Sequence, residues 1–270
     1  MPGRSRTDIV VLDSITAALE SHRGRVVIAG SHGGAYCGWL AARARLRGVL
    51  LNDAGIGLDR AGVGALALLD KAGVPAAAID YRSARIGDGA DMAARGSVSI
   101  VNDCARALGA REGMGAILCA SLFEAATLHD AQLAPPRETR TQLSADNGAG
   151  IEVMGLDSNS LVKAEDACRI VVTGSHGGLL GGRPASAIRL PVRAAVYNDA
   201  GGGADDAGWS RLPALDARGI PAMTVGCMTA RIGDARSAWL TGIVSVVNAR
   251  AQALGIRPGM PLPRALSRAV

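Results

Sequence analysis

The chain is poor in aromatic residues and in lysine. Only 3% of its 270 residues are aromatic and Phe123 is the single phenylalanine, so a packed interior has to be built from Ala, Val, Leu and Ile. Lys71 and Lys163 are the only lysines, and the net charge of +5 therefore comes almost wholly from arginine. These arginines are scattered and no aromatic residues alternate with them, which argues against nucleic-acid binding.

Paired cysteines and long apolar runs are also missing. The five cysteines show no CxxC and no paired spacing, which argues against a disulfide framework and a zinc knuckle. No apolar run approaches the ~20 residues that a membrane helix needs. Residues 1–8 contain Arg4 and Arg6 with no long apolar stretch behind them, so no secretion signal is expected. We therefore expect a cytoplasmic protein with no membrane partner.

What the chain does contain is a long internal repeat. Gly-Ser-His-Gly-Gly occupies residues 30–34 and again 174–178, Asn-Asp-Ala-Gly occupies 52–55 and 198–201, and Ala-Arg-Ile-Gly-Asp occupies 84–88 and 230–234. About half of the positions in 52–114 are identical to those 146 residues later. Two copies of this length predict an internally duplicated protein with two homologous halves related by a pseudo-twofold axis.

Each copy alternates short apolar runs with helical patterns, which predicts an α/β fold in which each half has a mostly parallel sheet flanked by helices. We expect a first repeat at 1–115, a connecting helix and linker at 116–150, and a second repeat at 151–270. The expected strands are 9–12, 26–29, 49–51 and 76–80 in the first copy and 170–172, 194–197 and 222–225 in the second. The expected helices are 13–20, 36–47, 62–72, 98–108 and 118–128, and 137–147 is expected as an exposed linker.

The repeated polar loops follow expected strands, at the sheet edge where α/β proteins bind ligands. Apolar positions differ between the copies while these polar residues are kept, which favours a function for them. The first loop supplies Ser31, His32 and Gly33, and its second copy supplies Ser175, His176 and Gly177. The imidazoles fit proton transfer, and the glycines and free N–H groups fit an anion. The alternative is a tight turn capped by histidine.

The other two loops supply an acidic pair and an arginine pair. Asp53, repeated as Asp199, fits base catalysis, the holding of a cation through oxygen ligands, or the bracing of an Asx turn. Asn52 and its copy Asn198 precede these aspartates. Arg85 and Arg231 fit the capture of a carboxylate or phosphate, or else an ion pair within their own loop. For Asp59 and its counterpart Asp205, capping of the following helix is the favoured interpretation. Cys227, where the first copy has Tyr81, would suit a reactive thiol, although most lone cysteines are inert.

The leading hypothesis is an enzyme that acts on a small anionic metabolite by proton transfer, as a hydrolase, isomerase or lyase, in a cleft between the halves. His32, His176, Asp53 and Asp199 would be catalytic. Ser31, Ser175, Gly33, Gly177, Asn52, Asn198, Arg85 and Arg231 would bind the substrate. No cofactor is required, and a divalent metal and a homo-oligomer stay open.

Two alternatives remain at this stage. One is a non-catalytic protein that binds small anions through the same loops, and the other is a structural duplication with no site. A separation of ~10 Å or less between His32 and His176 would indicate one shared site, because small-molecule pockets are compact.

Overall fold

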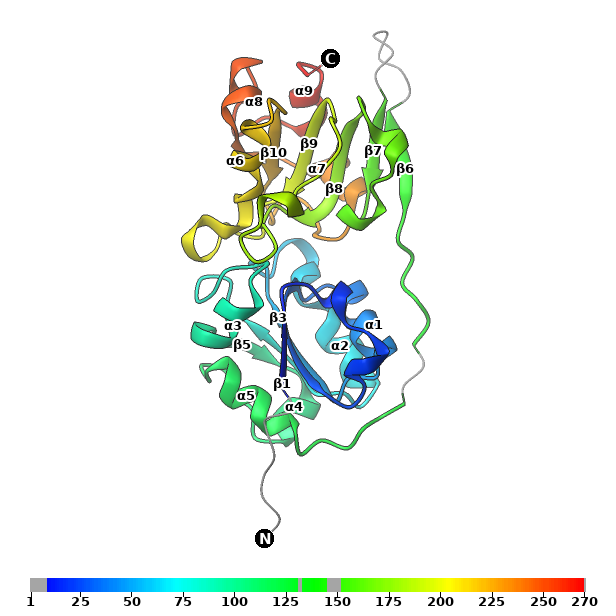
Figure 1. Cartoon of the computed structure of the whole chain (residues 1–270), viewed down its shortest axis with the longest axis vertical. Helices are drawn as coiled ribbons and strands as arrows, with labels where there is room; N and C mark the ends of the chain where they lie inside the picture. Colours follow the sequence, from blue (N-terminus) through cyan, green and yellow to red (C-terminus); the bar gives the residue numbers. More distant parts are fainter. Residues whose placement is uncertain (1–8, 131–132, 145–151, 270) are drawn as a thin grey trace.

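The computed structural model describes residues 9–130, 133–144 and 152–269. The segment 1–8, for which no secretion signal is expected, lies outside these residues, as does the 145–151 part of the expected linker. Two sheets are stacked end to end along the long axis, and the connection between them runs along one side of the molecule (Figure 1). Within the described residues, no helix combines the length and apolar character needed to span a bilayer.

The first sheet has five strands in the order β1-β2-β3-β4-β5. These are β1 (Ile9–Leu12), β2 (Val26–His32), β3 (Gly48–Asn52), β4 (Ala76–Ile79) and β5 (Val98–Val101). The first four run parallel, and β5 pairs antiparallel with β4.

The second sheet has the order β11-β10-β9-β8-β7-β6. Its strands are β6 (Arg140–Ser144), β7 (Val153–Leu156), β8 (Ile170–His176), β9 (Ala194–Asn198), β10 (Ala222–Val225) and β11 (Val244–Val247). Both edge strands, β6 and β11, are antiparallel to their neighbours. The α/β class is confirmed, and each sheet is mixed.

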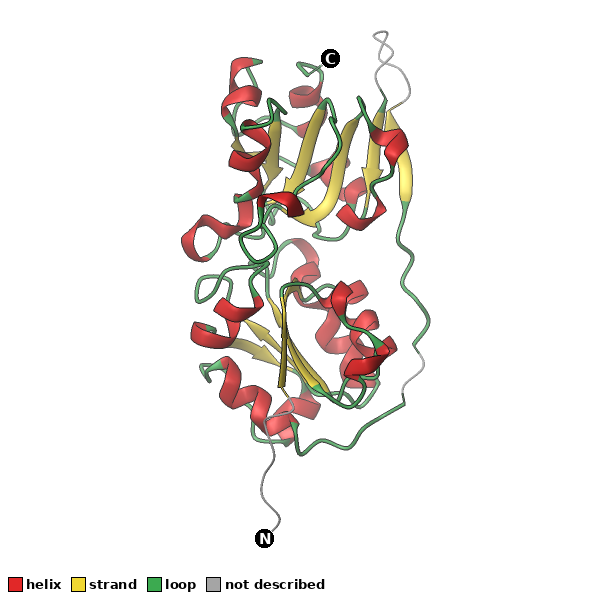
Figure 2. Ribbon diagram, viewed as in Figure 1, coloured by secondary structure: helices red, strands yellow, loops and turns green. Residues whose placement is uncertain are grey.

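Helices cover both faces of each sheet (Figure 2). In the first half, residues 9–123, α1 (Ala35–Arg43) and α2 (Gly64–Lys71) pack on one face. The other face carries α3 (Gly89–Arg95), α4 (Asp103–Ala107) and α5 (Ala116–Phe123). In the second half, the described residues between 140 and 269, α6 (Arg211–Asp216) lies on one face. The opposite face carries α7 (Ala235–Thr241), α8 (Ala249–Ala253) and α9 (Leu262–Leu266). Strands buried on both faces explain the absence of polar alternation in their sequences.

Short 3-10 turns complete the connections. They are η1 (Ile15–Ala17), η2 (Glu20–His22), η3 (Leu58–Val63), η4 (Asn159–Leu161), η5 (Ala164–Asp166), η6 (Pro184–Ser186) and η7 (Ala204–Trp209). The helix expected at 13–20 is therefore wrong. Ser14 accepts a hydrogen bond from the Thr16 N–H and starts η1, but the turn ends at Ala18, which is extended.

Three further expectations are corrected. Residues 98–101 form β5, and the expected helix 98–108 begins only at Asp103, after the Asn102 cap. Residues 140–144, expected in the linker, form β6. The described part of the second half has no counterpart of α1, because Gly181 and Gly182 adopt positive φ and Pro184 follows, which prevents a continuous helix.

Candidate functional site

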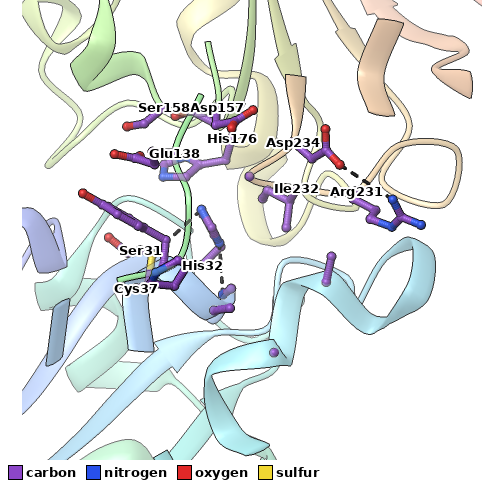
Figure 3. Close-up of a pocket in the computed structure, with 18 of the residues that line it drawn as sticks. Ser31, His32, Cys37, Glu138, Asp157, Ser158, His176, Arg231, Ile232 and Asp234 are labelled. Atoms are coloured by element: carbon purple, nitrogen blue, oxygen red, sulfur yellow. Dashed lines mark hydrogen bonds and ion pairs between the residues drawn. The ribbon is translucent and has the colours of Figure 1, made fainter. Parts of the chain in front are cut away.

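A cavity of about 410 Å³ lies between the two halves, where the carboxyl ends of β2 and β8 face one another (Figure 3). Its walls come from three parts of the chain. The first half supplies the Ser31–His32 loop and the start of α1, the second half supplies the Ser175–His176 loop and Arg211, and the connection supplies residues 136–138. The volume suits a small metabolite.

His32 and His176 are the last residues of β2 and β8. Their rings are 6.4 Å apart between centroids and meet edge to face, within the ~10 Å expected for one shared site. Nδ1 of His32 accepts the Gly34 N–H at 3.1 Å, and Nδ1 of His176 accepts the Gly178 N–H at 3.1 Å. An Nδ1 that accepts a hydrogen bond carries no proton, so each neutral ring holds its proton on Nε2.

Burial keeps both rings neutral. It lowers the pKa of His32 to about 4. Burial also lowers the pKa of His176 well below its usual value, and the nearby charge of Arg211 and the other imidazole add to this shift. At neutral pH both side chains are therefore N–H donors at Nε2. The Nε2 of His32 lies 3.9 Å from Cys37 Sγ, a weak acceptor that a ligand oxygen would displace.

Arg211 is the functional candidate that sequence reasoning missed. Its side chain is only 3% exposed, and Nε and Nη1 have no hydrogen-bond partner among the described residues. The guanidinium lies over the Tyr197 ring, 5.1 Å from its centroid. Burial lowers the Arg211 pKa. Ala65 holds the corresponding position in the first copy. A search for residues kept in both copies therefore passes over Arg211, and only a search for differences between the copies would have selected it.

Ser31 and Ser175 line the cavity, as the sequence predicts for substrate-binding residues. Ser31 Oγ accepts the Ile15 N–H at 2.9 Å, and Ser175 Oγ accepts the Asn159 N–H at 2.9 Å. Each hydroxyl therefore keeps its own hydrogen for another acceptor. Ser14 Oγ, 3.3 Å from Ser31 Oγ, is one such neighbour.

Glu138, which precedes β6, was also missed because it lies outside the repeat. It lines the cavity beside Tyr36 and Ser158. Burial raises the Glu138 pKa and the nearby Asp157 adds to the shift, while the hydroxyls of Tyr36 and Ser158 lower this pKa. Burial and Glu138 raise the pKa of Tyr36 to about 12, and the same two causes raise that of Cys37 to about 12. Neither group is ionised at neutral pH.

Asp53 and Asp199, predicted as catalytic, lie outside the residues that line the cavity. Asp53 Oδ1 accepts the N–H groups of Gly55 and Tyr81, and Asp199 Oδ1 accepts those of Gly201 and Cys227. Each carboxylate therefore braces its own turn against the loop after the next strand. Burial raises the Asp53 pKa.

Asn52 and Asn198 are buried outside the cavity and hydrogen-bonded within the protein. Their Oδ1 atoms accept the N–H of Ala54 and Ala200, and their Nδ2 groups donate to the carbonyls of Ala84 and Ala230. Through these contacts each side-chain amide joins its own turn to the loop that contains Ala84 or Ala230. This is a bracing role, which was one of the alternatives for this motif.

Gly33 and Gly177 also lie behind the cavity surface. A Cβ at Gly33 would come within 2.7 Å of the Gly62 carbonyl oxygen, and one at Gly177 within 2.5 Å of the Gly208 carbonyl oxygen. Their lack of a side chain is required for close backbone packing.

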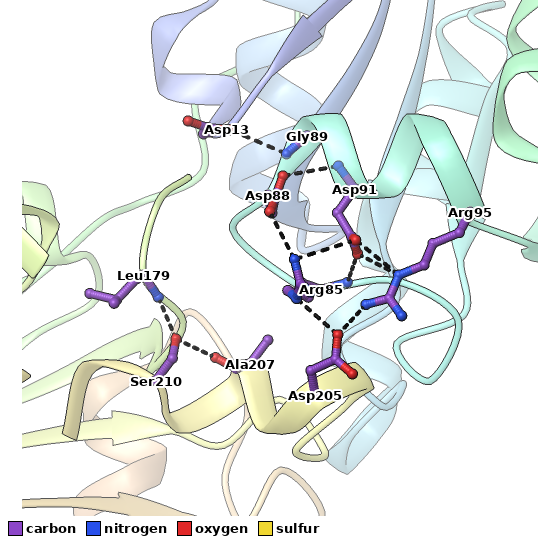
Figure 4. A network of polar contacts seen from close by, with 10 residues as sticks. All are labelled: Asp13, Arg85, Asp88, Gly89, Asp91, Arg95, Leu179, Asp205, Ala207 and Ser210. Carbon is purple, nitrogen blue, oxygen red and sulfur yellow. Dashed lines mark hydrogen bonds and ion pairs between the residues drawn. The ribbon is translucent and has the colours of Figure 1, made fainter. Parts of the chain in front are cut away.

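Arg85 and Arg231 form ion pairs across the two halves. Arg85 Nε lies 2.9 Å from Asp205 Oδ2, and Arg231 Nη2 lies 2.6 Å from Asp59 Oδ2. Figure 4 shows the first of these pairs, in which Asp205 also receives Arg95. Arg231 reaches the cavity wall, whereas Arg85 does not.

The repeated loops also contact each other through their backbones. The Leu58 N–H donates to the Cys227 carbonyl at 2.8 Å, and the Ala204 N–H donates to the Tyr81 carbonyl at 2.8 Å. A small apolar cluster joins the halves beside these bonds, formed by Ala54, Ile86, Ala200, Ala207 and Ile232. Cys227 is buried in this junction, and burial raises its pKa to about 11, so its thiol is protonated at neutral pH.

Across the ranges that the structure describes, His, Cys, Asp and Glu nowhere gather in groups of three that could hold a metal ion. Comparison with known proteins adds no assignment: no family model, no curated protein and no solved structure matches the chain.

Proposed function

We propose that the protein binds a small molecule carrying a carboxylate or phosphate group in the cavity between its halves. The observation that carries this proposal is Arg211, a buried guanidinium that lines the cavity and has no anionic partner among the described residues. An unpaired charge inside a protein costs several kcal/mol. A bound anion beside the guanidinium would supply the missing charge.

The surrounding donors support the same ligand. Two neutral imidazoles with protons on Nε2 and the hydroxyls of Ser31 and Ser175 border the cavity. Donors from both halves can bind the oxygens of one ligand, because the two rings are only 6.4 Å apart. In this arrangement the histidines act as hydrogen-bond donors, since an Nδ1 held by a backbone N–H disfavours the proton transfer expected from the sequence.

We further propose that the halves, with boundaries near 1–115 and 151–270, arose by duplication and are related by a pseudo-twofold axis. Reciprocal contacts support this: Leu58 N–H with the carbonyl of residue 227 is matched by Ala204 N–H with the carbonyl of residue 81. The pair Arg231–Asp59 is likewise matched by Arg85–Asp205. A contact made twice in this way constrains the sequence of both copies. In this proposal the Asn-Asp loops and the Arg-containing loops are conserved because they form the junction, and the histidine loops are conserved because they bind the ligand.

The test is Arg211→Met, followed by thermal unfolding with inorganic phosphate and small carboxylates such as malonate and pyruvate. A probe at about 100 times its Kd stabilises a protein by about 2.7 kcal/mol, which corresponds to roughly 5–10 °C for a chain of this size. We expect a shift of this kind in the wild type and its loss in Arg211→Met. Without ligand, the variant should be at least as stable as the wild type, because an unsatisfied buried charge is removed.

Arg264→Met is the matched control, since it removes the same charge from an exposed position on α9. It should keep the ligand-induced shift. The proposal fails if none of the probes raises the unfolding temperature of the wild type, or if Arg211→Met and Arg264→Met respond to the probes equally.

A second candidate is an enzyme that acts on the bound anion by proton transfer. One specific feature favours it: Glu138 adds a half-buried carboxylate to a wall whose other carboxylates, Asp59, Asp157 and Asp234, pair with Arg231 or accept backbone N–H groups. A cavity that only holds anions gains nothing from a carboxylate in its wall. The reaction classes expected from the sequence, hydrolase, isomerase and lyase, all use such a group.

A further inference from the structure

Glu138 is one of four carboxylates in the cavity wall, together with Asp59, Asp157 and Asp234. Asp59 and Asp234 pair with Arg231, and Asp157 accepts the N–H groups of Thr139 and Ala235. Glu138 is the carboxylate whose presence in an anion site these contacts do not explain.

Glu138 belongs to the connection between the halves and to neither sheet, and it lines the cavity beside Tyr36 from α1 and Ser158 from the start of η4. Glu138 therefore faces side chains from both halves. A negative charge here opposes the binding of an anion, so its presence calls for a role toward another part of the ligand.

The same cavity offers donors suited to an oxygen that gains negative charge during a reaction. His32 and His176 present Nε2–H groups, and their Nδ1 atoms are fixed by Gly34 and Gly178. Neutral imidazoles held in place in a buried site stabilise a developing oxyanion without giving up a proton. Together with Arg211, the cavity therefore combines a partner for a permanent anion, a pair of donors for a carbonyl oxygen, and a carboxylate.

We propose, on the basis that this cavity binds a small anion, that Glu138 is the general base that removes a proton from the carbon beside the carbonyl group of a bound 2-oxo carboxylate. Arg211 pairs with the carboxylate of the substrate. The two imidazoles donate to the carbonyl oxygen as it becomes an enolate.

The step balances without any further reactant. The C–H bonding pair becomes the carbon–carbon double bond of the enolate, the carbonyl π pair moves onto oxygen, and the proton moves to Glu138. Return of that proton to the same carbon regenerates the substrate, and its delivery to another atom isomerises it. No oxidant or reductant takes part.

Two features of Glu138 fit this role. A carboxylate can accept several hydrogen bonds, so the neighbouring hydroxyls of Tyr36 and Ser158 leave lone pairs for a substrate proton. Burial and the nearby Asp157 raise its pKa, and a base whose pKa lies closer to the working pH is more effective.

The test is proton–deuterium exchange at C3 of pyruvate, 2-oxobutyrate and 2-oxoglutarate in D2O, followed by proton NMR. The wild type should accelerate exchange of at least one of these acids. Glu138→Gln keeps the shape of the side chain and an oxygen for the Tyr36 hydroxyl, but it removes the base, so exchange should fall by about 100-fold or more. Glu112→Gln, at an exposed position, is the matched control and should exchange at the wild-type rate.

The outcomes separate this proposal from the binding function. If pyruvate or another 2-oxo acid raises the unfolding temperature through Arg211 but is not exchanged, or is exchanged equally by Glu138→Gln, the role of Glu138 is overturned while the anion site stands. If only phosphate or malonate binds through Arg211, the 2-oxo acid is the wrong substrate class. If no anion binds, both proposals fail. Glu138→Gln must show a temperature shift with the 2-oxo acid at least as large as that of the wild type, so that a folding defect is not mistaken for a lost base.

Discussion

At the scale of single residues, the chemistry of the cavity depends on which imidazole nitrogen carries the proton. Each histidine ends a strand, and the chain then turns so that the N–H two residues later points at Nδ1. Protonating Nδ1 would place two N–H groups against each other and would add charge to a buried site. The His-x-Gly spacing within Gly-Ser-His-Gly-Gly therefore produces a fixed neutral donor.

This arrangement has a consequence for stability at low pH. The pKa of His32 is about 4 in the folded protein, against 6.5 for an ordinary histidine, so below pH 6.5 the unfolded chain binds a proton that the folded chain refuses. The titration of His32 therefore leaves the free energy of unfolding unchanged above about pH 6.5. As the pH falls toward 4 it lowers this free energy, by about 2–3 kcal/mol at pH 4.5. Compared with His32→Gln, the wild type should lose about this much more unfolding free energy between pH 7.5 and 4.5, as measured by urea denaturation.

His129→Gln serves as the control, because His129 is exposed. This variant should lose the same unfolding free energy as the wild type over that pH range. Equal losses in the wild type and His32→Gln would show that His32 titrates normally in the folded protein.

Sequence reasoning selected part of the cavity lining, for a definable reason. The histidine and serine pairs were predicted because both copies keep them, and they line the cavity. Arg211 occurs in one copy only, with Ala65 at the matching position, and Glu138 lies between the copies. Asp53, Asn52 and Arg85 were predicted to touch a ligand because they are kept, but conservation between copies does not distinguish a ligand contact from a reciprocal contact between halves.

At the scale of elements, the loops that contain η3 and η7 have strained backbone conformations at the junction between the halves. Both loops contain non-glycine residues with positive φ at matching positions, Asp59 and Arg60 in η3 and Asp205 and Asp206 in η7. Such conformations cost free energy and persist only where the surroundings enforce them. The aspartates in these turns receive the arginines of the opposite half, which gives the strained backbone a role in the junction.

Two neighbouring glycines allow this packing to be tested. A Cβ at Gly62 would collide with the Asp53 and Ile56 carbonyls, whereas a Cβ at Gly64 would meet nothing closer than 3.5 Å. Gly62→Ala should therefore lower the free energy of unfolding by about 2–4 kcal/mol. Gly64 has helical φ and ψ values at the start of α2, so Gly64→Ala should be neutral or stabilising by up to about 1 kcal/mol.

Denaturant unfolding of the two variants measures the difference directly. Similar unfolding free energies for Gly62→Ala and Gly64→Ala would mean that the η3 loop can relax, and that its close contact with the Asp53 turn is not required for folding.

The elements themselves were predictable where the pattern was strong and unpredictable where tertiary contacts decide. The central strands match their apolar runs because these strands are buried on both faces. β5 was taken for a helix because Val98, Val101, Ala105 and Leu108 fall at helical spacing, but pairing with β4 holds residues 98–101 extended. β6 is polar, and only its pairing with β7 makes it a strand.

At the scale of the whole molecule, two similar scaffolds surround an asymmetric cavity. The strand ends bring one histidine from each half to the junction. The other walls differ: α1 supplies Tyr36 on one side, whereas the second half supplies Arg211 from the start of α6. We propose that duplication provided a rigid junction with two identical donors, and that later changes in one copy gave the site its charge and its direction.

The most direct test of a single shared anion site is an NMR titration of protein with 15N-labelled histidine. In the ligand-free protein at pH 7, the side-chain nitrogen shifts of His32 and His176 should be those of neutral rings protonated at Nε2. On addition of a carboxylate or phosphate that stabilises the wild type, both Nε2 signals should change with one common Kd and saturate at one ligand per chain, and neither should change in Arg211→Met. Three results would contradict a shared site: shift changes that fit different Kd values for the two rings, a change at only one ring, or ligand-induced changes in Arg211→Met as large as those in the wild type.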